Sequence, residues 1–175
     1  MAFKVYWCAR DLAGIPWGNH QFILIEFSSG FDVPPFSIQE EKGISFVTLA
    51  GYNVGDNLEF KDNAPSDVQA VKEVINPRKK GFFSDFDLEK NKVRVPSPQK
   101  SDQYFVESLA KQALIFKVKT QKRKIKYSLV DENCSAWVNT MFKVAGVSLV
   151  DRQKYGEFSG IDWGEEDLID ESYFK

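Results

Sequence analysis

Two residues of the sequence could act together as a nucleophile and a base, Cys134 and His20. Cys134 lies in the segment 131–146, which reads DENCSAWVNTMFKVAG. Because Asn133 is a good helix-capping residue, Cys134 is expected at about the first helical position. A helix N-terminus favours negative charge, and the thiolate is the nucleophilic form of cysteine. The segment therefore predicts a cysteine whose thiol pKa is lowered by the helix that it begins.

His20 is the only histidine in the chain. An imidazole that activates Cys134 must therefore come from this residue, and only the fold can bring the two together. His20 opens the segment HQFILIEF after a Gly-Asn loop, and the end of a strand is a suitable place to face a cleft. We expect a Cys134–His20 pair that catalyses acyl transfer; a structural or surface histidine is the alternative.

Cys8, the second cysteine, lies in the middle of a β-rich segment between Trp7 and Ala9. A thiol in such a place is usually packed in the core, so Cys8 is not expected to be the nucleophile. One disulfide between Cys8 and Cys134 would be an unusual staple in a chain with this much apolar sequence. One histidine and two distant cysteines do not make a zinc site, so no metal and no cofactor are expected.

The elements that must position these residues follow from local patterns. β-rich segments predict strands at 3–9, 20–27 and 44–53, with the last two paired antiparallel, and a shorter strand in KVRVP. Ser66 and Gln69 have the spacing of a capping box, which predicts a short helix over 66–75. A further helix is predicted from 101, with an ambiguous end near 118, and KIKYSLV predicts a short strand.

The strongest helical pattern follows Asn133. Trp137, Val138, Met141, Phe142 and Ala145 fall on one side at helical spacing, and Gly146 stands where a helix commonly ends. The tail from 151 is polar and acidic, with Trp163 and Phe174 as candidate anchors. The segments together predict one α+β domain that spans residues 1–175.

Composition narrows the function classes. The chain has 175 residues, of which 43% are hydrophobic, enough for one packed domain. A net charge of −2 gives no general attraction to nucleic acid. No stretch approaches the roughly 18 apolar residues of a membrane span, and the first residues do not form a Sec signal peptide. The basic run 117–126 is interpreted as a solvated helix end rather than a phosphate site.

ENCSAWVNTMFKVAGV resembles the cysteine motif of the NlpC/P60 papain-like superfamily, in which Asp-Cys-Ser-Gly precedes an apolar helix that ends in glycine and a β-branched residue. Asn133 replaces the aspartate and Ala136 the glycine. The histidine precedes the cysteine here, as in the circularly permuted branch, which includes lecithin:retinol acyltransferase-like proteins. The resemblance covers residues 18–53 and 125–147. It implies a permuted papain-like α+β fold with an antiparallel sheet packed against the cysteine-bearing helix.

The resemblance also implies a third polar residue, on the strand paired with the histidine strand, that orients the imidazole. Asn53 is the expected residue, with Thr48 and Gln39 as alternatives. The family carries a tyrosine upstream of the cysteine near the oxyanion, and Tyr127 matches that place, although a core tyrosine fits as well.

Backbone N–H groups at the start of the cysteine helix would bind the oxyanion in such a site. Asn133 and Ser135 flank the nucleophile there and are the expected oxyanion or substrate residues.

The function implied is that of a bacterial cysteine hydrolase, a thiol protease or amidase, which cleaves an amide in peptidoglycan peptides. Without a Sec signal, such an enzyme is expected in the cytoplasm of its producer. It would suit a toxin delivered into a target periplasm, as type VI secretion effectors are, with a cognate immunity protein. The alternatives are a lipid acyl hydrolase or acyltransferase, a deamidase, and a non-enzymatic binding module. Phenylalanines of PPFSI and GFFSDF could line an acyl groove, but ordinary packing is preferred.

Overall fold

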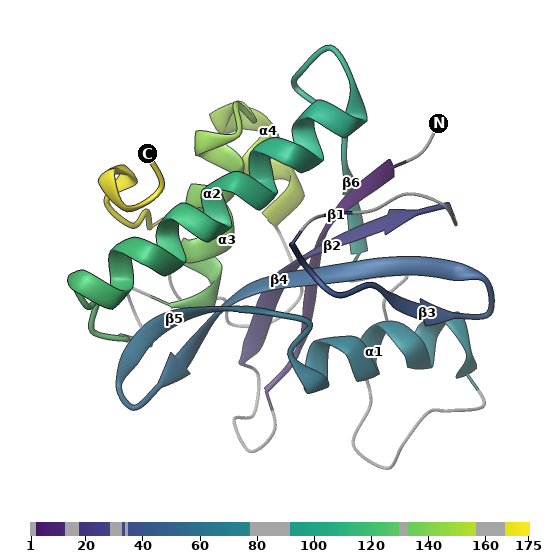
Figure 1. The fold of residues 1–175 in the computed structure, drawn as a ribbon, viewed down its shortest axis with the longest axis horizontal. Coiled ribbons are helices and arrows are strands. Elements are labelled where there is room, and N and C mark those ends of the chain that lie inside the picture. Colours follow the sequence, from purple (N-terminus) through teal and green to yellow (C-terminus); the bar gives the residue numbers. More distant parts are fainter. Residues whose placement is uncertain are drawn as a thin grey trace.

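The computed structural model describes residues 3–12, 18–28, 33, 35–77, 92–129, 133–156 and 167–175. Within these residues the strands form one six-stranded antiparallel sheet in the order β3-β4-β2-β1-β6, with β5 paired to β4 (Figure 1). The long strands are β1 (Phe3–Asp11), β2 (Asn19–Phe27) and β4 (Ile44–Val54), and the shorter ones are β3 (Gln39–Glu41), β5 (Asn57–Asp62) and β6 (Lys92–Val95).

Helices cover both faces of this sheet. The helices α2 (Asp102–Lys122) and α3 (Cys134–Val144) lie on one face, and α1 (Pro65–Ile75) packs near β3 and β4 on the other (Figure 1). The helix α4 (Leu149–Gly156) packs on α3, and a short 3₁₀ helix (Glu171–Tyr173) lies beside α2. The protein therefore belongs to the α+β class, as predicted. None of the helices in the described ranges has both the length and the apolar character needed to cross a bilayer.

The strand β2 is buried on both sides because it separates two apolar cores. Ile23 and Ile25 belong to the core beneath α2 and α3, whereas Phe22 and Leu24 belong to the smaller core beneath α1. Side chains alternate between the two faces of a strand, so a strand covered on both faces is a continuous apolar run. The sequence FILI has this character, and it holds His20 rigidly at the start of the strand.

The strands predicted at 3–9, 20–27, 44–53 and in KVRVP are confirmed, as is the antiparallel pairing of β2 with β4, in which Ile23 lies opposite Leu49. The strand β5 was missed. It follows a two-residue turn in which Gly55 and Asp56 both have positive φ angles of 57° and 64°. Such a Gly/Asp pair is a hairpin signal, and it directs the chain back along β4. The described part of KIKYSLV, residues 124–129, forms an isolated bridge, from Lys126 to Asn57, in place of the predicted strand.

The predicted helices exist, with changes at their ends. The capping box is wrong, because α1 begins at Pro65 after Ala64 and has no side-chain cap. Proline suits the first helical position, where its missing N–H costs nothing. The hydroxyl of Ser66 instead accepts a hydrogen bond from Arg10 at 2.8 Å. The helix α2 continues past 118 to Lys122 and is capped by Ser101, whose hydroxyl accepts from the N–H of Tyr104.

The cysteine helix is confirmed over Cys134–Val144. Gly146 follows it with a φ of +96°, a conformation that glycine adopts without strain. Phe174 is an anchor as predicted: it is 1% exposed, and its ring centroid lies 4.8 Å from that of Phe116 on α2. Trp163, the other candidate anchor, lies outside the described residues.

Candidate active site

The position of Cys134 depends on the Asn133 cap. The side-chain oxygen of Asn133 accepts hydrogen bonds from the N–H groups of Ser135 and Ala136 at 2.9 and 3.0 Å. Its amide nitrogen donates to the carbonyl of Leu129 at 2.9 Å, which fixes the approach to the helix. Cys134 is therefore the first residue of α3, as predicted, and is 3% exposed. In a site with so little water, charges interact more strongly than at the surface.

His20 is held by the rings around it. It is the second residue of β2 and is 3% exposed. Its ring centroid lies 4.4 Å from that of Tyr52 on β4, and the ring stacks near Phe22 at 6.3 Å with an interplanar angle of 15°. These contacts leave the imidazole little freedom to rotate, which is what a positioned acid or base requires.

The fold brings His20 and Cys134 together. The imidazole makes a side-chain hydrogen bond to Cys134 and also feels its charge. Burial has the largest influence on His20 and lowers its pKa, but Asp67 and then Cys134 outweigh burial and raise the pKa from 6.5 to about 9. The imidazole is therefore protonated at neutral pH, beside a sulfur at a helix N-terminus.

Asp67 on α1 is the third member of the site. Its Oδ1 lies 3.5 Å from Nε2 of His20, an ion-pair distance that is long for a hydrogen bond, and 2.7 Å from Nε of Arg10. The carboxylate is 1% exposed. Burial raises the pKa of Asp67, but His20 and then Arg10 lower it below its ordinary value.

The sequence pattern does not single out Asp67. Acidic residues are common in the first turn of any helix, where they complement the helix dipole, so this aspartate carried no separate signal of chemistry. Only the docking of α1 beneath β2 and β4 turns it toward the imidazole.

The structure does not place Asn53 against His20, so that part of the prediction is wrong. Side chains alternate along β4, and Tyr52 is the one that faces the imidazole. Asn53 is exposed, and its side-chain oxygen accepts a hydrogen bond from the N–H of Asp56 at 3.0 Å within the hairpin turn. Neither alternative is paired with His20. Thr48 lies opposite Leu24, further along β2, and Gln39 on β3 lies opposite Phe46 of β4.

The structure does bring Tyr127 to the nucleophile. The phenol makes hydrogen bonds to both the side chain and the backbone of Cys134. Burial and then the charge of Cys134 raise the pKa of Tyr127 above its ordinary value, so the hydroxyl keeps its proton. Tyr127 therefore lies against the nucleophile predicted from the sequence.

The other two predicted oxyanion residues, Ser135 and Asn133, contribute to the structure of the first turn of α3. Ser135 is 1% exposed in the first turn of α3, and its N–H is taken by the Asn133 side chain. Asn133 acts as the cap of α3, and the backbone of Cys134 forms a hydrogen bond with the phenol of Tyr127.

Cys8 has none of these features. It is fully buried in the core beneath α1, and burial raises the pKa of its thiol well above the ordinary value. No disulfide joins Cys8 to Cys134. A search of the described residues for three or more metal-ligating side chains in one cluster found none.

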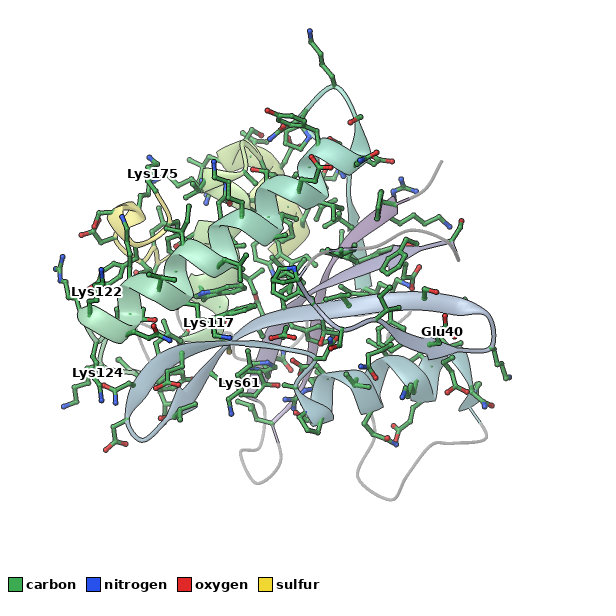
Figure 2. The ribbon with its side chains drawn as sticks, in the orientation of Figure 1. Glu40, Lys61, Lys117, Lys122, Lys124 and Lys175 are labelled. Atoms are coloured by element: carbon green, nitrogen blue, oxygen red, sulfur yellow. The ribbon has the colours of Figure 1, made fainter. Side chains whose placement is uncertain are left out.

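The basic run 117–126 lies at the C-terminal end of α2 and in the segment that follows. Lys117, Lys122 and Lys124 are exposed, and Figure 2 shows Lys122 and Lys124 at the left of the view with Lys117 nearer its middle. Lys119 instead donates to the carbonyl of Ser172 at 2.7 Å, so the C-terminal tail covers part of the run. This arrangement supports the interpretation as a solvated helix end.

The aromatic segments offered for an acyl groove divide in two. Phe36 of PPFSI is 6% exposed, and its ring packs 5.8 Å from that of Phe60, so it belongs to the core. The segment GFFSDF, residues 81–86, lies outside the described residues.

Comparison of the chain with protein-family models, with curated proteins and with solved structures found no match.

Proposed function

We propose that this protein is a cysteine hydrolase that works by acyl transfer and has the circularly permuted papain-like arrangement. The observation that carries the proposal is the placement of His20 between Cys134 and Asp67, with the sulfur at the start of α3. An imidazole held by a carboxylate beside a thiol is the arrangement that activates a cysteine for attack on a carbonyl.

The reaction begins from a thiolate–imidazolium pair. The sulfur of Cys134 attacks the substrate carbonyl carbon, and the negative charge moves to the carbonyl oxygen. The hydroxyl of Tyr127, which lies against Cys134, is the donor that we expect to stabilise that oxyanion. When the oxyanion collapses, the C–N bond breaks and His20 gives its proton to the leaving amine, which leaves a thioester on Cys134.

Water completes the cycle. His20, now neutral, takes a proton from a water molecule, and the resulting hydroxide attacks the thioester carbon. The C–S bond breaks, the acid is released, and the thiolate and the imidazolium are restored. Asp67 keeps the imidazole oriented and stabilises its positive charge throughout.

The substrate class that we propose is an amide in a peptide of peptidoglycan, as the resemblance of ENCSAWVNTMFKVAGV to the NlpC/P60 motif implies. The role of a secreted antibacterial toxin, held in check by an immunity protein, is part of the same proposal. The burial of Phe36 removes one of the features that favoured a lipid substrate.

The test is hydrolysis of purified peptidoglycan fragments, with product masses read by mass spectrometry. Cleavage is expected for the wild type and for Cys8→Ala, and it is expected to disappear for Cys134→Ala, because only Cys134 adjoins an imidazole. A parallel reaction with phospholipid vesicles tests the acyl-ester alternative. Cleavage that survives in Cys134→Ala would contradict the mechanism, and cleavage of the lipid alone would contradict the substrate.

A further inference from the structure

Arg10 is a charged residue of this region to which the reaction assigns no step. It lies directly opposite His20 in the pairing of β1 with β2, so both side chains project from the same face of the sheet. Two positive groups in that relation repel each other unless an anion lies between them. Asp67 is that anion, and its Oδ1 is 2.7 Å from Nε of Arg10 and 3.5 Å from Nε2 of His20.

The guanidinium does more than pair with one carboxylate. Its Nη2 donates to the hydroxyl of Ser66 at 2.8 Å and to that of Tyr52 at 3.1 Å, and its Nη1 donates to the backbone carbonyl of Asp11 at 3.1 Å. Arg10 therefore links β1, β4 and the first turn of α1. Its side chain is 12% exposed, and its bonds to Asp67 and Tyr52 are partly buried.

The carboxylate has reason to leave the imidazole if nothing holds it. Asp67 is the third residue of α1, and this helix has no side-chain cap, although the carbonyl of Ala64 accepts from the N–H groups of Asp67 and Val68. A short acidic side chain at this place is attracted to its own helix N-terminus. The bond to Arg10 draws Oδ1 away from the helix and toward the sheet, where His20 lies.

We propose that Arg10 is a positioning residue of the site, which holds the Asp67 carboxylate against the imidazole of His20 through its forked contacts. The inference rests on the proposed catalytic arrangement, since Arg10 would act on the reaction only through Asp67 and His20. Among the described residues, four charged or titratable groups surround the imidazole: Arg10 from β1, Tyr52 from β4, Asp67 from α1 and Cys134 from α3.

Because the chain has one histidine, the imidazole can be titrated by NMR without ambiguity. In Asp67→Asn the His20 midpoint is expected to fall by about one pH unit or more, since an opposite charge at this distance has that effect. In Arg10→Gln we expect the midpoint to fall toward the Asp67→Asn value, by roughly half a pH unit or more. The matched control is Arg94→Gln on β6, which removes an arginine from the sheet away from Asp67 and should leave the midpoint unchanged.

The direction of the shift separates two roles for Arg10. If Arg10 were only a nearby positive charge, its removal would raise the His20 midpoint, because the imidazolium would lose a repulsive neighbour. A raised or unchanged midpoint in a folded Arg10→Gln protein therefore overturns the proposal. If Arg10→Gln does not fold, Arg10→Lys takes its place, because lysine keeps the charge but loses the forked contacts of the guanidinium. A smaller fall of the His20 midpoint is expected in this variant. A midpoint equal to that of the wild type overturns the proposal.

This titration needs no substrate, so its outcome is independent of the hydrolysis experiment. If no substrate is cleaved but Arg10→Gln still lowers the midpoint, the catalytic proposal fails and the positioning role stands. If hydrolysis is found but the midpoint of Arg10→Gln does not fall, the catalytic proposal stands and the positioning role of Arg10 fails.

Discussion

The pairing of Asp67 with His20 is the residue-level feature that distinguishes this site from the one expected from the sequence. Asn53 was the expected partner, and the structure places it in a hairpin turn, bonded to the N–H of Asp56. A carboxylate differs from an amide because it stabilises the charged imidazole as well as orienting it. The two candidates can therefore be separated by mutation.

Asp67→Asn is expected to reduce the hydrolysis rate by roughly 100-fold, the effect of weakening a general acid and base. On the basic side of the pH–rate profile, the rate of Asp67→Asn should begin to fall at a lower pH than the wild-type rate. The proposed reaction uses protonated His20, so the wild-type rate is expected to fall as the pH rises through about 9. Because Asp67 raises that pKa, its loss lowers the pH at which the rate falls.

The control for this experiment is Asn53→Ala, with rates measured across pH 5–10 for all three proteins. We expect the rates of Asn53→Ala to match those of the wild type within about a factor of two at each pH. The side chain is exposed, and its hydrogen bond is to the N–H of Asp56 in the hairpin turn. A large loss in Asn53→Ala, with Asp67→Asn unaffected, would restore the residue chosen from the sequence.

At the level of elements, the site is an assembly of three secondary structures. The helix α3 supplies the sulfur, β2 the imidazole and α1 the carboxylate. Each element forms because of a local feature of the sequence: an asparagine cap for α3, a continuous apolar run for β2 and a proline at the first position of α1. The cap is the device with the most direct effect on the nucleophile, because it fixes the first turn from which Cys134 projects.

Asn133→Ala is expected to destabilise the fold by about 1 kcal/mol, because the N–H groups of Ser135 and Ala136 lose their acceptor. It should also slow alkylation of Cys134 by iodoacetamide at pH 7, by roughly fivefold if the same free energy is lost from the thiolate. Chemical denaturation measures the loss of stability, and mass spectrometry of the alkylated protein measures the rate at which Cys134 is labelled.

Ser101→Ala is the matched control, since Ser101 caps α2 in the same way. It should cost similar stability and leave the labelling rate of Cys134 unchanged. Equal slowing in both variants would mean that the label reports general loosening and not the cap of α3.

At the scale of the whole molecule, the proposed catalytic arrangement depends on α3 packing close to the sheet. Gly51 on β4 makes this possible. A Cβ added there would meet Cβ and Cγ of Trp137, and Cδ1 of Leu58, all at 2.9 Å. No flexible side-chain end is available to give way at the tryptophan, so the helix would have to move.

Gly51→Ala is therefore expected to destabilise the protein by about 2–3 kcal/mol through overpacking, measured by urea denaturation. Gly43→Ala is the comparison: no atom lies within 4 Å of the added carbon, and only its φ of +77° disfavours alanine, at a cost of about 1 kcal/mol. If Gly51→Ala costs no more than Gly43→Ala, the close seating of α3 is wrong.

The sequence was sufficient for features that depend on near neighbours. The cap at Asn133, the helix from Cys134, the apolar run of β2 and its pairing with β4 were all read from local patterns. Asp67 could not be found in that way, because its role depends on how α1 docks beneath the sheet. The choice of Asn53 failed for a related reason: a shift of one residue turns a side chain to the other face of a strand.

The most direct test of the central claim is the titration of the single imidazole in the wild type and in Cys134→Ala, followed by NMR. If the sulfur and the imidazole form one charged pair, the wild-type midpoint should lie near 9, and it should fall when the sulfur is removed, because Cys134 raises the pKa of His20. A wild-type midpoint near 6.5, or one that does not change in Cys134→Ala, would contradict the claim that these two residues act together.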